Sequence, residues 1–105
     1  MKLINDKKLD HYHSITKKAL KKVKINKKLS KKDEKTAKLY LDMAKNYYSD
    51  SIYFRKQNDY VNSFAAVNYA HAWLDAGAII GLFDVDKDNV LFTVDPWFYV
   101  SNLPF

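Results

Sequence analysis

The sequence predicts an all-α domain, an up-down-up bundle of three helices followed by an irregular or short-hairpin C-terminal extension. Its 105 residues are the length of one domain, and 48% of them are hydrophobic, which is enough for one core. Residues 1–76 contain neither glycine nor proline, so nothing in this stretch interrupts a helix. Apolar side chains recur at steps of three and four, and short polar segments divide the pattern into three helical stretches.

The first helix is expected over about residues 10–25. It carries a single apolar stripe on a surface that is otherwise covered by lysines. The members of this stripe are Tyr12, Ile15, Ala19, Leu20 and Val23. The polar segment Asn26–Ser30 then ends the pattern.

The second helix is expected over about residues 31–56. The Ser30 hydroxyl can accept a hydrogen bond from the backbone at the start of this helix, and Asp33 can complete a capping box. The apolar stripe consists of Ala37, Tyr40, Leu41, Ala44, Tyr47, Tyr48, Ser51 and Phe54. The polar segment Gln57–Asp59 marks the next break.

The third helix is expected over about residues 60–80 and has two adjacent apolar sides. One side consists of Phe64, Val67, Ala70, His71, Leu74 and Ala78. The other consists of Val61, Ala65, Ala72, Ala76 and Ile79. Because its apolar arc is so wide, we expect this helix to be the most buried of the three. Gly81 is suited to end it, since glycine reaches positive φ without strain.

The C-terminal extension, residues 82–105, has a different character. Leu82–Val85 and Val90–Val94 are short β-prone runs on either side of the polar stretch Asp86–Asn89, which predicts a turn or a small hairpin. The final stretch Trp97–Phe105 is apolar, and we expect it to pack along the bundle or against another subunit.

Charge is divided unevenly along the chain. Residues 1–35 contain 13 lysines and 4 acidic residues, a net charge of +9, whereas the remaining residues have a net charge of −3. A split of this kind suggests an acidic partner for the basic part.

The composition excludes several classes of protein. There is no cysteine, which excludes disulfides, thiolate metal sites and a cysteine nucleophile. No apolar run has the length of a signal peptide or approaches the roughly 18 residues of a membrane span. We therefore expect a soluble, cytoplasmic protein that has no membrane partner.

Four segments of the chain, Asn46–Phe54, Ser63–Ala66, Tyr69–Gly77 and Gly81–Val85, have a recognisable pattern. The chain resembles a family of small archaeal proteins, domain-of-unknown-function family 357, over about residues 36–94. Ala72 stands where the family pattern has glycine. The resemblance implies a spectrin-repeat-like bundle of three helices, and it brings no activity, cofactor or catalytic residue.

The C-terminal extension contains a candidate calcium loop. Asp84, Asp86, Asp88 and Asp95 occupy positions 1, 3, 5 and 12 of an EF-hand-like segment. Asn89 replaces the usual turn glycine, and aspartate replaces the usual glutamate at the last position. The alternative is a solvated, Asp-rich turn without a metal.

A second candidate site consists of His71 and Asp75, which lie four residues apart and so share one helix face. With Asp50 from the second helix, the pair could ligate a metal or transfer protons. The alternative is a buried polar contact within the bundle. His11 and His13 are expected to be exposed and to have no ligating role.

The basic region is a candidate nucleic-acid surface. Its lysines are Lys17, Lys18, Lys21, Lys22, Lys24 and Lys28. Lysines along one face attract phosphate backbones, but the chain has a single arginine, Arg55, and no known nucleic-acid-binding motif. The alternative is a solvated face.

The aromatic residues form a fourth candidate site, a surface for a protein partner. The chain contains 8 tyrosines, 6 phenylalanines and 2 tryptophans. The rings on the second helix exceed what a single narrow stripe can bury, and they are Tyr40, Tyr47, Tyr48, Tyr53 and Phe54. The candidate interface residues are Tyr47, Tyr48, Trp73, Trp97 and Phe98. The alternative is a core built from large rings.

The sequence therefore favours a non-enzymatic protein-interaction or oligomerisation module, with a protein partner or a second copy of itself. One alternative is an accessory protein that binds nucleic acid weakly through the first helix. The other is a metal-binding protein or enzyme at His71 and Asp75 or at the segment Asp84–Asp95. We assign no catalytic residue and expect no cofactor.

Overall fold

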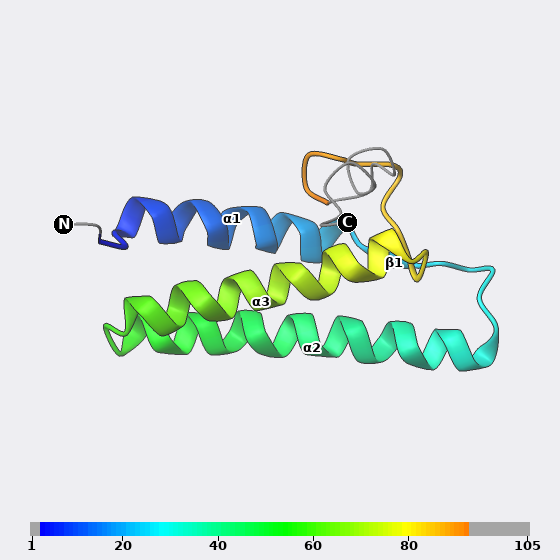
Figure 1. Cartoon of the computed structure of the whole chain (residues 1–105), viewed down its shortest axis with the longest axis horizontal. Helices are drawn as coiled ribbons and strands as arrows, with labels where there is room; N and C mark the ends of the chain where they lie inside the picture. The colour runs from blue at the N-terminus through cyan, green and yellow to red at the C-terminus, as the bar shows by residue number, and fades with distance from the viewer. Residues whose placement is uncertain (1–2, 93–105) are drawn as a thin grey trace, which may run out of the picture.

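The computed structural model describes residues 3–92 of the chain. Three helices are packed together, and a small two-stranded sheet joins two of their ends (Figure 1). The elements in chain order are α1 (Asp6–Lys22), β1 (Lys24–Ile25), α2 (Lys31–Lys56), α3 (Tyr60–Ile79) and β2 (Phe83–Asp84). Helices α1 and α3 run in one direction and α2 in the other (Figure 1). The predicted up-down-up bundle is confirmed.

Local capping signals account for the ends of α2 and α3. The Ser30 hydroxyl accepts a hydrogen bond from the backbone N–H of Asp33, and Asp59 accepts one from the N–H of Asn62. Asn58 has a φ of 60° in the tight turn between the two helices. After α3, Gly81 has a φ of 82°, as expected for a residue that ends a helix.

Helix α1 lies earlier in the chain than predicted. It begins at Asp6, where the side chain of Asn5 accepts a hydrogen bond from the N–H of Lys8, and it ends at Lys22. The predicted range of about 10–25 was wrong at its C-terminal end because residues 24–25 are extended and form β1.

The sheet pairs β1 with β2 in antiparallel register. Lys24 lies opposite Asp84, and Ile25 lies opposite Phe83. The predicted hairpin between residues 82–85 and 90–94 does not describe this pairing, because the partner of Phe83–Asp84 comes from the α1–α2 connection. Residues 90–92 lie in a turn region, whereas residues 93–94 and the apolar stretch 97–105 lie outside the described residues.

The core lies mainly between α2 and α3, where small side chains bring the two helices close together. The fully buried apolar residues include Ala37 and Ala44 on α2 and Val67, Ala70 and Leu74 on α3. Beyond the end of α3, the chain packs Leu82, Phe83, Val85 and Phe92 into the same core.

The Phe83 ring lies directly against the backbone of Gly77. A Cβ atom on Gly77 would lie 2.3 Å from Cε2 of Phe83, so only glycine fits this position. This contact fixes β2 against the last turns of α3.

Helix α1 packs chiefly against α3 and much less against α2. The buried residues of α1 are Leu9, His13, Thr16 and Ala19. The predicted stripe shared Ala19 with this set, but its other members are half-buried and form the edges of the contact. Among residues 3–92, no helix combines the length and the apolar character that crossing a membrane requires.

Candidate functional site

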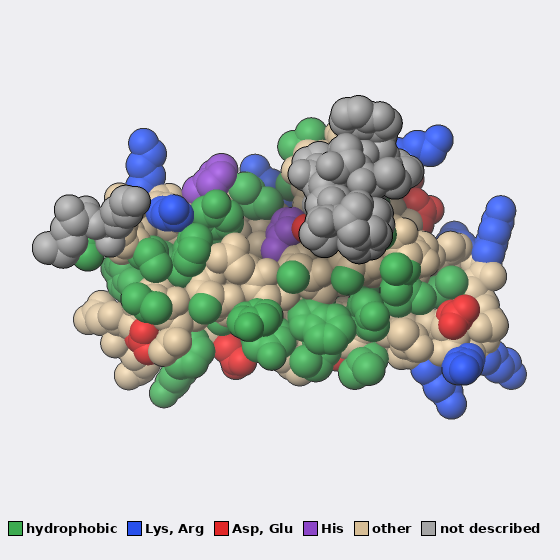
Figure 2. Space-filling view, viewed as in Figure 1, with side chains coloured by type: hydrophobic (Ala, Val, Ile, Leu, Met, Phe, Trp, Pro, Cys, Tyr) green, Lys and Arg blue, Asp and Glu red, His purple; other side chains and the backbone are tan. Residues whose placement is uncertain are grey.

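The most distinctive surface of the molecule is an exposed apolar stripe along α3, which we call the outer stripe. Its residues are Val61, Ala65, Tyr69, Ala72, Ala76 and Ile80. They follow one another at steps of four, four, three, four and four, so they lie on one face of the helix. Val61 is 70% exposed, Tyr69 60% and Ile80 59%. Figure 2 shows hydrophobic side chains gathered along α2 and α3 on this face, with Lys and Arg mainly toward its edges and ends.

This stripe corrects one expectation. The second apolar side of α3 was expected to be buried, but the described part of the chain leaves most of it exposed. The reason is that α2 and α1 pack against the other sides of α3. A helix that is apolar all round is normally enclosed, and α3 is enclosed only in part.

Aromatic rings from α2 border the outer stripe. Tyr47 stacks on Tyr69 with ring centroids 5.3 Å apart, and Tyr40 meets Trp73 edge-on at 4.9 Å. An open cavity of about 290 Å³ lies in this region. It is lined by Tyr69, Ala72, Trp73 and Ala76. Tyr47 and Trp73, two of the candidate interface residues, are therefore brought together at this surface.

Tyr48, the third candidate interface residue within residues 3–92, does not join this surface. Tyr48 lies edge-on against the His13 ring at 5.9 Å, and burial raises the pKa of its hydroxyl. Trp97 and Phe98 lie outside the described residues.

Between the three helices lies a buried hydrogen-bond network that the sequence analysis missed. Nε2 of His13 lies 2.6 Å from Oγ of Ser51, and that hydroxyl donates to the backbone carbonyl of Ser63 at 2.6 Å. The Ser63 hydroxyl in turn donates to the carbonyl of Ser51 at 2.8 Å. Both serines are 0% exposed and His13 is 6% exposed, so the expectation that His13 is exposed was wrong. His11 is exposed, as expected.

In the neutral ring of His13, the hydrogen bonds place the proton on Nε2. Because the Ser51 proton is donated to a carbonyl, Ser51 accepts from Nε2–H of His13, and Nδ1 is bare in the neutral ring. Nδ1 is buried and has no hydrogen-bond partner among the described residues. Burial lowers the pKa of His13, and the positive charge of Arg55 lowers it further, whereas the Leu9 carbonyl acts in the opposite direction. His13 is therefore held neutral.

A second polar contact joins α1, α3 and the C-terminal extension at His71. Nε2 of His71 lies 2.7 Å from the carbonyl of Leu91, and Nδ1 lies 3.0 Å from the hydroxyl of Thr16. Since a carbonyl only accepts, Nε2 carries a proton, and Nδ1 of the neutral ring accepts from Thr16. The carboxylate of Asp75 lies 3.7 Å from Nε2. Both ring nitrogens are thus engaged with the protein itself.

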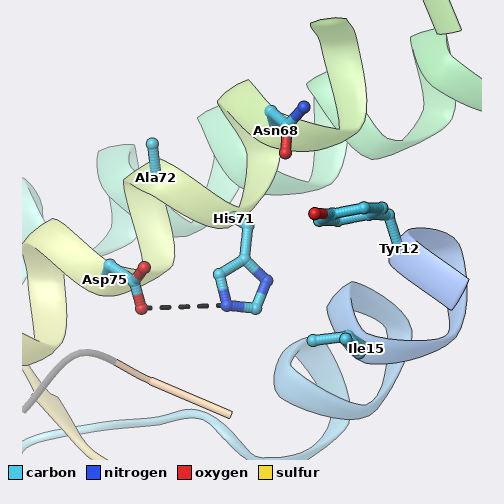
Figure 3. A pocket seen from close by; sticks show the side chains of 6 residues that line it. All are labelled: Tyr12, Ile15, Asn68, His71, Ala72 and Asp75. Carbon is cyan, nitrogen blue, oxygen red and sulfur yellow. Dashed lines mark ion pairs between the residues drawn. The ribbon is translucent and has the colours of Figure 1, made fainter. Parts of the chain in front are cut away.

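A cavity of about 230 Å³ opens beside His71, between α1 and α3. It is lined by Tyr12, Ile15, Asn68, His71, Ala72 and Asp75 (Figure 3). Asp50 is exposed on α2, and residues 3–92 contain no group of three or more His, Asp or Glu side chains that could hold a metal ion. The structure brings His71 and Asp75 together but adds no third ligand.

The comparison with known families agrees with this architecture. The family model described as "Protein of unknown function (DUF357)" matches residues 11–83, which include most of α1 and all of α2 and α3. The chain belongs to this family. The match confirms the resemblance. It begins before the expected starting point near residue 36, so it includes α1, and it ends at residue 83 rather than near residue 94. No match to a curated protein or to a solved structure was found.

In this DUF357 protein the candidate calcium loop makes hydrogen bonds to itself and to α1. One carboxylate oxygen of Asp88 accepts from the backbone N–H groups of Val90 and Leu91, and the other lies 2.9 Å from Nζ of Lys22. These contacts lower the pKa of Asp88, the Leu91 N–H most strongly. Asp84 accepts from the N–H of Asp86.

The three aspartates of this loop do not form a cation site within residues 3–92. Asp95, the fourth predicted ligand, lies outside the described residues. In the described part, Asp84 and Asp88 shape the backbone of the turn rather than a metal site.

The candidate nucleic-acid surface of the DUF357 protein is exposed at all of its lysines except one. Lys17, Lys18 and Lys21 are exposed on α1, followed by Lys24 on β1 and Lys28 in the next loop. Lys22 is half-buried and pairs with Asp88. The single arginine, Arg55, pairs with Asp6 at 3.1 Å and with Asp10 at 2.6 Å, which holds the start of α1 to the end of α2.

Proposed function

We propose that this protein is a non-enzymatic interaction module that binds a helical protein segment along the outer stripe of α3. The observation that supports the proposal is the exposed stripe itself, which runs the whole length of the helix and contains no charged residue. Large exposed apolar patches on folded proteins are typical of interaction sites. Singly scattered apolar residues would need no such explanation, but these six share one face.

The shape of the surface favours a helix as the bound element. Helix α3 has 20 residues and is therefore about 30 Å long. Ala65, Ala72 and Ala76 allow a second helix to approach closely, while Tyr69 and Trp73 offer large rings at the edge of the groove. An apolar helix face lying in a groove is a common mode of recognition.

The polar side chains of the bundle support the non-enzymatic part of the proposal. The two nitrogens of His71 and the carboxylate of Asp88 are already engaged with groups of the protein. The hydrogen bonds of His13, Ser51 and Ser63 likewise hold the helices together. These contacts give the polar groups a structural role, and the outer stripe remains without one.

The proposal is tested by photo-crosslinking from the stripe. A photoreactive p-benzoylphenylalanine replaces Ala72, and in a matched control it replaces Ser14, which is exposed on α1. After irradiation in the native cells, we expect adducts from position 72 and few from position 14. Equal adducts from both positions, or none from position 72, would contradict the proposal.

A second candidate function is weak nucleic-acid binding through the exposed lysines Lys17, Lys18, Lys21, Lys24 and Lys28. Their exposure on consecutive elements supports it, because phosphate contacts need accessible side chains. Titration with RNA and with duplex DNA at two salt concentrations tests it. Binding that weakens steeply with salt is expected, and absence of binding at low salt would exclude it.

A further inference from the structure

The steps between consecutive residues of the outer stripe have the same order when α3 is followed from its N-terminus or from its C-terminus. From Val61 to Ile80 the steps are four, four, three, four and four, so the midpoint falls between Tyr69 and Ala72. A stripe with this symmetry can pair with an antiparallel copy of itself. We infer that the segment bound by the outer stripe is α3 of a second copy of this chain, related by a two-fold axis that passes between Tyr69 and Ala72. This inference rests on the proposed function and names its partner.

The two-fold arrangement pairs residues of complementary size. In an interface between identical surfaces, residue i contacts residue j and residue j contacts residue i. Here Tyr69 faces Ala72, Ala65 faces Ala76, and Val61 faces Ile80. The largest side chain of the stripe thus lies opposite a methyl group at the centre, and on either side of the centre Ala65 and Ala76 oppose each other with small side chains.

The cavity beside the stripe provides the space that this register needs. It is about 290 Å³ in volume and is bounded by Tyr69, Ala72, Trp73 and Ala76. In the antiparallel register, the partner subunit's Tyr69 enters it over Ala72 and contacts Trp73. The rings of Tyr40 and Tyr47 on α2 extend the contact to both sides, so α2 and α3 of two copies form a four-helix arrangement.

Charge favours the antiparallel orientation over the parallel one. Exposed lysines cluster at one end of the molecule, around the start of α2. They are Lys27, Lys28, Lys31, Lys32 and Lys35. A parallel pair would place the two clusters side by side and would oppose Tyr69 with Tyr69, whereas the antiparallel pair places the clusters at opposite ends.

The interface would bury no charged residue of α3. Asp75 is the single Asp, Glu, Lys or Arg in Tyr60–Ile79, and it lies beside His71 on the α1 side of the helix (Figure 3). On α3, the partner therefore meets a surface from which no charge has to be desolvated.

Sedimentation velocity of the full chain over a range of concentrations is the first test. We expect a monomer–dimer equilibrium, and we expect Ala72→Arg to raise the dimer dissociation constant at least about 30-fold, as for loss of a central contact. Tyr69→Glu is a second variant with the same expected direction. Ser14→Arg places the same charge on the exposed face of α1 and is expected to leave the equilibrium unchanged. Circular dichroism checks that each variant retains its helices.

The register is tested by crosslinking, which the absence of native cysteine makes simple. Chains that carry Ala65→Cys are mixed with chains that carry Ala76→Cys, and a short bismaleimide is added. The antiparallel register predicts that mixed adducts exceed the adducts formed by either chain alone. An excess of adducts between identical chains would instead indicate a parallel pair and overturn the inference.

The outcomes separate this inference from the proposed function. If the chain is monomeric at all concentrations while position 72 crosslinks to another protein in cells, self-association is wrong and the interaction module stands. If the chain is monomeric and position 72 forms no adduct, both are wrong. A dimer that Ala72→Arg and Tyr69→Glu leave intact overturns the inference, because it uses another surface.

Discussion

Each of the two sides of α3 contains residues that depart from the usual distribution of polar and apolar residues. On the side that faces the other helices, Ser63 is fully buried and His71 is 21% exposed, and both make polar contacts across the bundle. On the opposite side, Val61 and Tyr69 are 70% and 60% exposed. Polar residues are normally outside and large apolar residues normally inside.

The difference separates two tasks. The inner contacts are directional: His13 reaches Ser51, and Thr16 reaches His71, so the position of α1 on the bundle is fixed by hydrogen bonds at specific residues. The outer stripe is apolar, and an apolar surface contributes to stability only when another surface removes it from water. Inner residues therefore determine the fold of one chain, and outer residues are available for association.

The largest effect is expected from comparing Leu74→Ala with Val61→Ala. Leu74 is 0% exposed in the core, so its truncation should lower the free energy of unfolding by about 2–5 kcal/mol. Val61 is 70% exposed, and its truncation should change the free energy of unfolding of the monomer by less than about 0.5 kcal/mol. Urea unfolding at low protein concentration measures both. Similar losses for the two variants would show that the two sides of α3 contribute equally to the stability of the monomer.

A smaller loss is expected from Ser51→Ala. It leaves Nε2–H of His13 without an acceptor in a buried site, which should cost about 1–3 kcal/mol. Ser49→Ala, at an exposed position of the same helix, is the control and should be neutral. In a double-mutant cycle, Ser51→Ala and Ser63→Ala should be non-additive because the two hydroxyls are each bonded to the other residue's carbonyl. Additive effects would mean that the network is not cooperative.

The inner contacts also predict a pH dependence. Folding lowers the pKa of His13 from its ordinary value of 6.5, so the unfolded chain binds a proton first as the pH falls. The stability from neutral His13 is fully present above pH 6.5 and is lost as the pH falls from there through the folded pKa. The carboxyls of Asp6 and Asp88 also have lowered pKa values, but their contribution is lost only below about pH 3.8, whereas the loss from His13 begins near pH 6.5.

Variants at the two neighbouring histidines separate this contribution. His13→Gln should flatten the fall in unfolding free energy just below pH 6.5, whereas His11→Gln, at an exposed position, should leave it in place. Chemical unfolding at a series of pH values is the measurement. If both variants behave like the original protein, buried His13 is not the titrating group.

The smallest effect is expected at the end of α1, where Lys22 pairs with Asp88. The lysine side chain is 38% exposed, so solvent screens the pair, and Lys22→Gln should cost at most about 1 kcal/mol. The loss should shrink further at high salt. A larger, salt-independent loss would indicate that α1 is held by this ion pair rather than by the inner hydrogen bonds.

Features of the fold that depend on local chemistry were predictable from the sequence. Ser30, Asp59 and Gly81 act through neighbouring backbone groups, and the ends of α2 and α3 follow from them. The β1–β2 pair was not predictable, because Lys24 and Asp84 are far apart in the chain and neither carries a signal for the other. The early start of α1 depends on Asn5, whose capping role is visible only once the helix is in place.

The candidate site was likewise predictable only where it depends on local sequence. The wide apolar arc of α3 was evident from the sequence, but which side α1 would cover depends on packing between distant segments. His13 lies at helical steps from Leu9 and Thr16, which is a signal for a buried position, yet the surrounding lysines suggested exposure. Its partner Ser51 was placed on the apolar stripe of α2, and nothing in the sequence connected the two residues.

The strand pair also bears on the order of folding. Helices α2 and α3 are joined by a tight turn, so their contacts close a short loop, whereas the pairing of β1 with β2 closes a loop that contains both helices. Closing a longer loop costs more chain entropy unless the intervening segment is already compact. We therefore expect the α2–α3 hairpin to form first. The pairing of β1 with β2 and the packing of α1 are expected to form last. Weakening the pairing of β1 with β2, for example at Ile25 opposite Phe83, should then speed unfolding and leave the rate of folding almost unchanged.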